Sequence, residues 1–286
     1  MSLHSTRIRL AGFETRALCL DALPERPRLL CLHGWGDSAD AYKPLFSAIE
    51  GEFSAVALDA PGHGEASSER GGARLPQWID LCRAAIEHCE HAAPLILIGQ
   101  SFGARAVLSA LAGDAAARRR VARVIAIAPA PLQLPPWQQV FVRNRALAEG
   151  VASLSAGSSP EQAIAAVVER HRRTSFHAPE SLAASVFEDY ARHVSIERAA
   201  RSVDELRQIG EELQQPLSLA ELSAPVDIVW GRQDRLAPLS GAQDYLAVLP
   251  HAQLEVIDDC GHHAHIEAPQ RIAALLRRAG SSGDQG

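Results

Sequence analysis

The stretch LILIGQSFGARAVLSALAG, at residues 95–113, constrains the fold more than any other part of the chain. It opens with four branched apolar residues and closes with the apolar spacing of an amphipathic helix, and Ser101 lies between them with a glycine two residues away on each side. A sharp turn from strand to helix forces its central residue to a positive φ. Glycine at 99 and 103 avoids a collision where strand and helix pass each other. The stretch therefore predicts a strand, a tight turn and a helix, with the Ser101 hydroxyl exposed at the helix N-terminus.

Seven further short runs have strand character and lie far enough apart to hold helices between them. The first two alternate apolar and polar residues and predict an antiparallel hairpin. The inner runs are nearly unbroken apolar segments, which is typical of parallel strands covered on both faces. The eight runs are 7–10, 15–20, 29–32, 55–58, 95–98, 124–128, 226–230 and 254–257, and helices are expected at 42–49, 75–89, 102–111, 241–249 and 269–279. Together they predict an α/β fold with a mostly parallel eight-stranded sheet flanked by helices.

The segment 132–216 breaks this alternation. It holds no convincing strand and only helical stretches, at 161–172 and 180–201, and prolines mark both of its ends. We therefore expect a core formed by residues 1–131 and 217–280, an all-helical cap at 132–216, and a disordered tail at 281–286.

Composition excludes several classes of partner. The 286 residues carry a net charge of −6, with both signs interspersed, and the only tight basic run is at 118–120, where we expect a solvated helix end. This charge pattern favours neither nucleic acid nor a membrane surface. No stretch approaches the roughly 20 apolar residues of a membrane span, and the start of the chain lacks the apolar core of a secretion signal. Five scattered cysteines predict reduced thiols and a cytoplasmic protein. The oligomeric state stays open.

A serine hydroxyl is a poor nucleophile without a base, and the base needs an orienting group. Polar side chains follow the last two predicted strands: Asp234 comes after 226–230, and His262 comes after 254–257. The carboxyl ends of parallel strands meet at one edge of the sheet, so these groups can reach Ser101. The sequence thus predicts a nucleophile, an acid and a base from three separate loops.

The loop at 258–265 leaves alternatives open. His265 is a second candidate base, and Asp258 or Asp259 is a second candidate acid. The same histidines and aspartates could instead hold a metal ion, although a metal site would leave Ser101 unexplained.

An oxyanion site needs two N–H donors. The Phe102 N–H is free of helix partners because it opens a helix. The run 29–32 leads into His-Gly-Trp-Gly (33–36) at the same sheet edge, so the backbone N–H of Trp35 is the second predicted donor. We expect His33 and His63 to structure their loops.

These features resemble the α/β-hydrolase family, particularly its serine esterases of the carboxylesterase and meta-cleavage-product hydrolase type. The matching segments are Leu-Cys-Leu-His-Gly-Trp-Gly (30–36), Leu-Asp-Ala-Pro-Gly-His-Gly (58–64), Gly-Gln-Ser-Phe-Gly (99–103), Gly-Arg-Gln-Asp (231–234) and Gly-His-His-Ala-His-Ile-Glu-Ala-Pro (261–269). The chain order Ser101, Asp234, His262 is that of the family. The resemblance implies an α/β-hydrolase fold with a helical cap, the histidine directly after glycine (His262) as base, and neither cofactor nor metal.

The expected reaction is hydrolysis of a small carboxylic ester through an acyl-enzyme. Alternatives are a thioesterase, or a C–C bond hydrolase of the meta-cleavage-product type, which needs a substrate-holding arginine such as Arg105 or Arg192. His33 and Gly34 are further candidates for substrate contact. A non-catalytic receptor that uses the same pocket for a small molecule is the alternative of another class.

Overall fold

The computed structural model describes residues 3–21, 27–67, 74–89, 95–132, 134, 159–194 and 208–281. One eight-stranded sheet runs through it in the order β1-β2-β4-β3-β5-β6-β7-β8. The strands are β1 (Leu3–Leu10), β2 (Phe13–Leu20), β3 (Arg28–Leu32), β4 (Ser54–Leu58), β5 (Leu95–Gln100), β6 (Val121–Ile127), β7 (Val226–Gly231) and β8 (Gln253–Ile257).

Strand directions confirm the predicted α/β fold. β1 pairs antiparallel with β2, and β2 pairs antiparallel with β4. Every other neighbouring pair, from β4 and β3 across to β7 and β8, is parallel. All residues of the central strand β5 are buried, as expected for a parallel strand covered on both faces.

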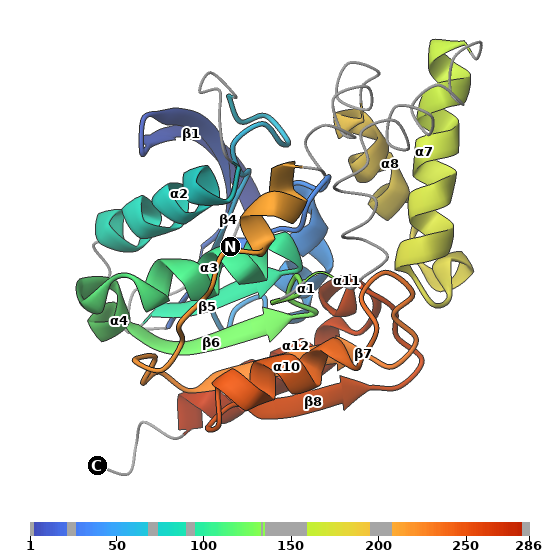
Figure 1. Cartoon of the computed structure of the whole chain (residues 1–286). Helices are drawn as coiled ribbons and strands as arrows, with labels where there is room; N and C mark the ends of the chain where they lie inside the picture. The colour runs from blue at the N-terminus through green and yellow to red at the C-terminus, as the bar shows by residue number, and fades with distance from the viewer. Residues whose placement is uncertain are drawn as a thin grey trace.

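Helices cover the two faces of the sheet (Figure 1). The helices α2 (Arg74–His88), α3 (Phe102–Ala112) and α10 (Gly241–Val248) contribute to one hydrophobic cluster. The helices α1 (Lys43–Ala48) and α12 (Pro269–Ser281) contribute to the cluster on the opposite face. The sheet is therefore the middle layer of three, and its carboxyl edge is left for the loops that carry the polar candidates.

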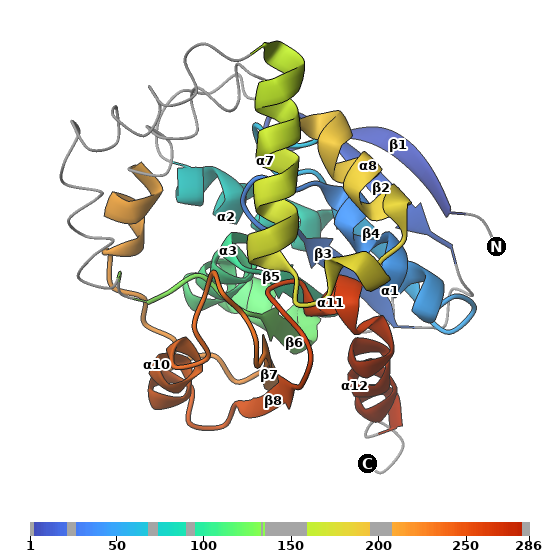
Figure 2. The same ribbon diagram turned by 90° about the vertical axis from the view of Figure 1, so that its right-hand side faces the viewer.

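The segment predicted to form the cap is strand-free wherever the structure describes it. Helix α7 (Pro160–Ser175) begins with a capping box on Ser159, and residues 208–213 are also helical. Helices α7 and α8 (Ala184–His193) lie beyond the carboxyl ends of the strands (Figures 1 and 2). Residues 135–158 and 195–207 of this predicted segment lie outside the described residues.

The single helix predicted at 180–201 is wrong in its first part. A 3-10 turn, η2 (Pro179–Ser181), precedes α8, and the backbone between them is extended at Leu182 and Ala183. Pro179 suits the first position of a short helical turn, so the chain starts one turn there, stops, and starts again. Helix α12 extends through Ser281, the first residue of the predicted tail, and the rest of that tail lies outside the described residues.

Helix α4 (Ala115–Arg120) was not predicted, although its start carries a clear signal. Asp114 caps it by accepting hydrogen bonds from the N–H groups of Ala116 and Ala117. The basic run 118–120 forms its last turn, as predicted for a helix end, where cations interact favourably with the dipole.

The five cysteines are unpaired, as predicted. Among the described residues, no helix has both the length and the apolar character needed to cross a bilayer.

Candidate active site

Ser101 occupies the sharp turn that the sequence predicts. Its φ is 52° and its ψ is −117°, a conformation that costs free energy in a residue other than glycine. Its backbone is held on both sides, because its N–H donates to the Ile127 carbonyl over 2.8 Å and its carbonyl accepts from Ala130 over 3.0 Å. The strain is thus fixed by the neighbouring strand β6.

The two flanking glycines are both required, for different reasons. A Cβ atom at Gly99 would lie 2.4 Å from the Cα of Ala104, which is the predicted collision of strand with helix. At Gly103, a Cβ atom would lie 2.2 Å from the His33 carbonyl oxygen. The second close approach is therefore to the loop after β3, and not to β5. Gly103 lets helix α3 pack directly against the candidate oxyanion loop.

Trp35 and Phe102, whose backbone N–H groups are the predicted oxyanion donors, are neighbours. Their side-chain rings pack edge to face, with centroids 5.8 Å apart. Neither backbone N–H donates a hydrogen bond to any described residue. Gly34 adjoins the nucleophile, since a Cβ atom there would lie 3.2 Å from the Ser101 Cβ.

Asp234 and His262 form the second part of the site. The Nδ1 atom of His262 lies 2.6 Å from Oδ2 of Asp234, and both side chains are buried. The other carboxylate oxygen, Oδ1, accepts from the N–H groups of Leu236 and Ala237 over 2.8 Å each. These two bonds fix the carboxylate, and the carboxylate in turn fixes the imidazole, which leaves the Nε2 atom for other chemistry.

The loop carrying His262 is held from several directions. The Gly261 N–H donates to Glu267 over 2.8 Å, and the His177 N–H donates to the other oxygen of the same carboxylate over 2.7 Å. The His262 N–H donates to the Ser175 carbonyl over 2.7 Å. Residues of α7 and of the turn after it thus position the histidine loop.

Gln100 links this loop to the strained turn. Its Nε2 atom donates to the His262 carbonyl over 3.2 Å. Since Gln100 immediately precedes Ser101, the three predicted catalytic residues are connected by two direct hydrogen bonds and one peptide link. The structure therefore brings the three predicted loops together at one edge of the sheet.

The alternative bases and acids are placed differently. His265 is fully buried with its ring 4.8 Å from that of Tyr42, and burial lowers its pKa to about 3. Asp258 pairs with Arg232, and Asp259 lies 3.7 Å from the His177 ring nitrogen. Across the described residues, no three acidic, histidine or cysteine side chains are grouped to hold a metal ion.

His33 connects two loops from a fully buried position. Its Nε2 atom accepts from the Ala60 N–H over 2.9 Å, and its Nδ1 atom lies 2.7 Å from the Gly34 carbonyl. Burial lowers its pKa to about 4, so the ring is neutral and can donate from Nδ1 while it accepts at Nε2. The ring of His63 lies 5.8 Å from it.

The side chains of the two candidate arginines bond to groups other than the proposed catalytic residues. Arg105 is buried in α3 and donates to the Gln215 carbonyl over 3.2 Å. Arg192 is largely exposed on α8 and pairs with Asp189 over 2.9 Å.

Sequence reasoning missed a buried ion-pair network beside the site. Asp40 accepts from Arg16 at 2.9 Å, from Lys43 at 3.0 Å and lies 3.0 Å from Nε2 of His193. Hydrogen bonds from His193, Arg16 and Lys43 hold the pKa of Asp40 far below its usual range, against burial, which raises it. Because the partners come from distant parts of the chain, no local pattern signals the network.

Comparison with known proteins agrees with this geometry. The family model described as "Alpha/beta hydrolase family" matches residues 29–275. The chain belongs to the α/β-hydrolase family. The match spans the candidate nucleophile, acid and base together with the segment between them.

Individual relatives are distant but span most of the chain. A pimeloyl-[acyl-carrier protein] methyl ester esterase from Xanthomonas campestris is 26% identical over 91% of this chain and 97% of its own. A monoacylglycerol lipase from Mus musculus is 24% identical over 88% of this chain and 74% of its own. A solved esterase from Thermogutta terrifontis superposes with a TM-score of 0.72 at 21% identity, covering 96% of this chain and 97% of that one. The structural likeness shows the fold.

Proposed function

We propose that the chain is a serine hydrolase that cleaves small carboxylic esters, with Ser101 as nucleophile, His262 as base and Asp234 as the residue that orients the base. The observation that carries the proposal is the 2.6 Å contact between Asp234 and the Nδ1 atom of His262, on a loop that Gln100 ties to the strained Ser101 turn. The esterase and lipase names of the relatives agree with this reaction.

The proposed reaction has two half-reactions. The Ser101 Oγ attacks the ester carbon while His262 Nε2 accepts the hydroxyl proton. The bond from that carbon to the alcohol oxygen then breaks, and His262 returns the proton to the departing alcohol. Water repeats the sequence on the acyl-enzyme, which releases the acid and restores the Ser101 hydroxyl. Asp234 stabilises the imidazolium in both halves, and this chemistry needs no cofactor.

The backbone N–H groups of Trp35 and Phe102 are the proposed oxyanion donors. Their position beside Gly34 and Ser101, and their lack of partners among the described residues, support this role. Losing one such donor costs about 10²–10³ in rate in comparable sites. Because both are main-chain groups, the geometry of their loops matters more than their side chains.

We further propose that residues 132–216 form a cap over this edge, on a core of 1–131 and 217–280. The described helices of the segment contact the core through charged groups: Lys43 donates to Asp189 of α8 over 2.8 Å, and His193 of α8 contacts Asp40. These bonds hold α8 beside the candidate oxyanion loop.

The test is hydrolysis of p-nitrophenyl acetate and butyrate by the wild type and by Ser101→Ala. We expect turnover by the wild type, loss of nearly all of it in the variant, and an unchanged melting temperature. Wild-type rates in Ser101→Ala would refute the mechanism. A folded wild type that binds these esters without turnover would indicate the receptor alternative.

A further inference from the structure

A pocket of about 290 Å³ lies between the first turns after β3 and the helices of the proposed cap. It is bounded by the 3-10 turn η1 (Ala39–Tyr42), by α1, by α8 and by the end of α7. Its lining is mixed: the apolar part includes Pro44, Phe176, Val186, Phe187 and Ile266. Charged side chains lie at two places on this wall, and they differ in how well they are paired; His171, Ser185 and Tyr190 are further polar residues of the lining.

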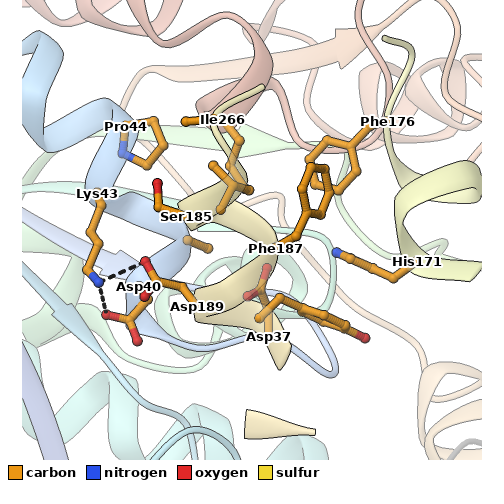
Figure 3. Close-up of a pocket in the computed structure, with 14 residues that line it drawn as sticks. Asp37, Asp40, Lys43, Pro44, His171, Phe176, Ser185, Phe187, Asp189 and Ile266 are labelled. Carbon is orange, nitrogen blue, oxygen red and sulfur yellow. Dashed lines mark hydrogen bonds and ion pairs between the residues drawn. The ribbon is translucent and has the colours of Figure 1, made fainter. Parts of the chain in front are cut away.

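The first polar group is fully paired. Figure 3 shows Lys43 bonded to both Asp40 and Asp189, with contacts of 3.0 and 2.8 Å. Asp189 also accepts from Arg192, and Asp40 from Arg16. These charges compensate one another, so this part of the wall carries no unpaired charge among the described residues.

The second polar group, Asp37, is only partly paired. Its side chain is about 7% exposed, and Oδ1 accepts from the Ser38 N–H over 2.9 Å. Oδ2 accepts no hydrogen bond from any described residue, and the Nδ1 atom of His263 lies 3.8 Å away, beyond bonding distance. In Figure 3, Asp37 lies on the same side of the pocket as His171 and Phe187. Because the rest of the side chain is largely buried, a ligand donor that reaches Oδ2 would add a hydrogen bond to a charged acceptor.

The surroundings of Asp37 make this oxygen unusual. Burial raises the pKa of Asp37 to about 7, and the nearby negative charges of Asp40 and Asp59 act in the same direction. No positively charged group within the described chain forms a close ion pair with it. A second carboxylate brought into this pocket would meet like charge, whereas a hydroxyl or ammonium group would supply the missing donor.

The pocket adjoins the proposed catalytic groups. Phe176, on its wall, stacks on His263 with ring centroids 4.9 Å apart, and the His263 ring lies 5.3 Å from that of His262. On the other side, Asp37 follows Trp35 by two residues and donates its own N–H to the Gly34 carbonyl. The rings of Phe176 and His263 therefore form one layer of side chains between the pocket and the proposed base.

We propose that Asp37 is a specificity-determining residue, and that this pocket selects esters whose distal end carries a hydrogen-bond donor, a hydroxyl or an ammonium group, over esters ending in a methyl or carboxylate group. The proposal rests on the proposed function for the reaction itself. It adds the chemical class of the substrate, which neither the fold nor the relatives' names assign.

The test compares p-nitrophenyl esters of hexanoic, 6-hydroxyhexanoic and 6-aminohexanoic acid and the mono-ester of adipic acid, at pH 8.5. A second series, hexyl and 6-hydroxyhexyl butyrate, carries the distal methyl or hydroxyl group on the alcohol chain of the ester and not on the acyl chain. In at least one series we expect kcat/KM for the donor-bearing ester to exceed that of its methyl-ended match about 10- to 150-fold, as a hydrogen bond to a charged acceptor gives. The adipate ester is expected to be the poorest acyl substrate. The comparison of the 6-hydroxyhexanoate and 6-aminohexanoate esters shows whether the pocket prefers a hydroxyl or an ammonium group.

Variants distinguish a loss of selectivity for the distal group from a general loss of activity. Asp37→Ala is expected to abolish the ratio between matched esters, while Asp258→Asn, which removes a surface pair with Arg232, leaves the ratio unchanged. A merely structural role of Asp37 would lower both rates together and keep the ratio. Equal rates for all esters in both series, a preference for adipate, or a ratio retained in Asp37→Ala would overturn the proposal.

A binding measurement makes the test independent of turnover. Calorimetry with Ser101→Ala and the uncleaved 6-hydroxyhexanoate and hexanoate esters is expected to show the same preference, lost in the Ser101→Ala, Asp37→Ala double variant. A preference in binding with no wild-type hydrolysis would refute the esterase function and retain the pocket assignment. Equal binding of the two esters, with the wild type active, would refute the pocket assignment alone.

Discussion

The side-chain amide of Gln100 donates a hydrogen bond to the backbone carbonyl of His262 over 3.2 Å. This bond joins the turn that carries the proposed nucleophile to the loop that carries the proposed base. The other end of the same amide, Oε1, faces Gly34, where a Cβ atom would lie only 2.0 Å from it. Three loops of the site therefore meet at one carboxamide.

Gly34→Ala is expected to disturb catalysis through this contact. The added methyl group must displace the Gln100 side chain, and with it the His262 loop, and misplacement of about 1 Å can cost on the order of 10²-fold in rate. We expect kcat/KM for p-nitrophenyl butyrate to fall about 10- to 100-fold. Gly51→Ala is the control, because Gly51 has a φ of +81° with open space around a Cβ, so this change strains the backbone without a contact like the one at Gly34. Equal rates in the two variants would contradict the account.

Asp234→Asn is expected to lower kcat about 10³- to 10⁴-fold, the effect of this change in the Ser-His-Asp triad of serine proteases. An amide can present N–H to Nδ1 of His262 and so favour the wrong tautomer, while its oxygen still accepts from Leu236 and Ala237. The melting temperature should therefore change little. Asp258→Asn is the matched control, because Asp258 pairs with Arg232 at the surface, and it should keep wild-type kcat. A large loss in the control with none in Asp234→Asn would reverse the assignment.

The proposed catalytic residues could be singled out in the sequence because their signals are local. Gly99 and Gly103 around Ser101, and Asp234 and His262 directly after apolar runs, mark the ends of strands whose order the sheet fixes. The reason for Gly103 could not be predicted, since its close neighbour is the His33 carbonyl, 70 positions earlier in the chain.

The residues around the pocket could not be predicted in the same way. Asp37 acquires its character from burial, and one of its neighbours, His263, comes from more than 200 positions away. Asp40 gathers partners from β2 and α8. These properties arise from tertiary packing, and neither periodicity nor motif spacing carries them.

Acid is expected to unfold the chain through its buried histidines. Burial lowers the pKa of His33 to about 4 and those of His171 and His265 to about 3. The pKa of each histidine in the folded chain lies below its value near 6.5 in the unfolded chain. At a pH between the two pKa values, the unfolded chain therefore binds more protons than the folded chain. Stability present above pH 6.5 is therefore lost as the pH falls toward 4, by roughly 1.4 kcal/mol per pH unit for each such histidine.

Urea unfolding at pH 7, 6, 5 and 4 measures this slope. His171→Phe keeps an aromatic ring against Tyr190 and Phe176. It should reduce the dependence of the unfolding free energy on pH by the contribution of one histidine, roughly 1.4 kcal/mol per pH unit. His251→Gln, at an exposed position, should leave it unchanged. A free energy of unfolding that is flat from pH 6.5 to 4 would show that these rings take up protons in the folded state.

Glu267→Gln is expected to destabilise the histidine loop. Both carboxylate oxygens accept a backbone N–H, from Gly261 and from His177, and an amide nitrogen cannot replace either acceptor. Leaving one buried N–H without a partner costs about 1–3 kcal/mol, measured as the free energy of unfolding in urea. Glu255→Gln, which removes a surface contact with Arg271, should cost under about 1 kcal/mol. Equal losses in both variants would contradict the positioning role.

The central claim is that Ser101 is the hydroxyl activated by His262. Labelling with a fluorophosphonate, followed by peptide mapping, tests it most directly, because the reagent bonds covalently to an activated serine. The account predicts a single modified peptide carrying the label on Ser101, and loss of labelling in Ser101→Ala and in His262→Ala, both still folded. Labelling at another residue, or undiminished labelling of Ser101→Ala, would contradict it.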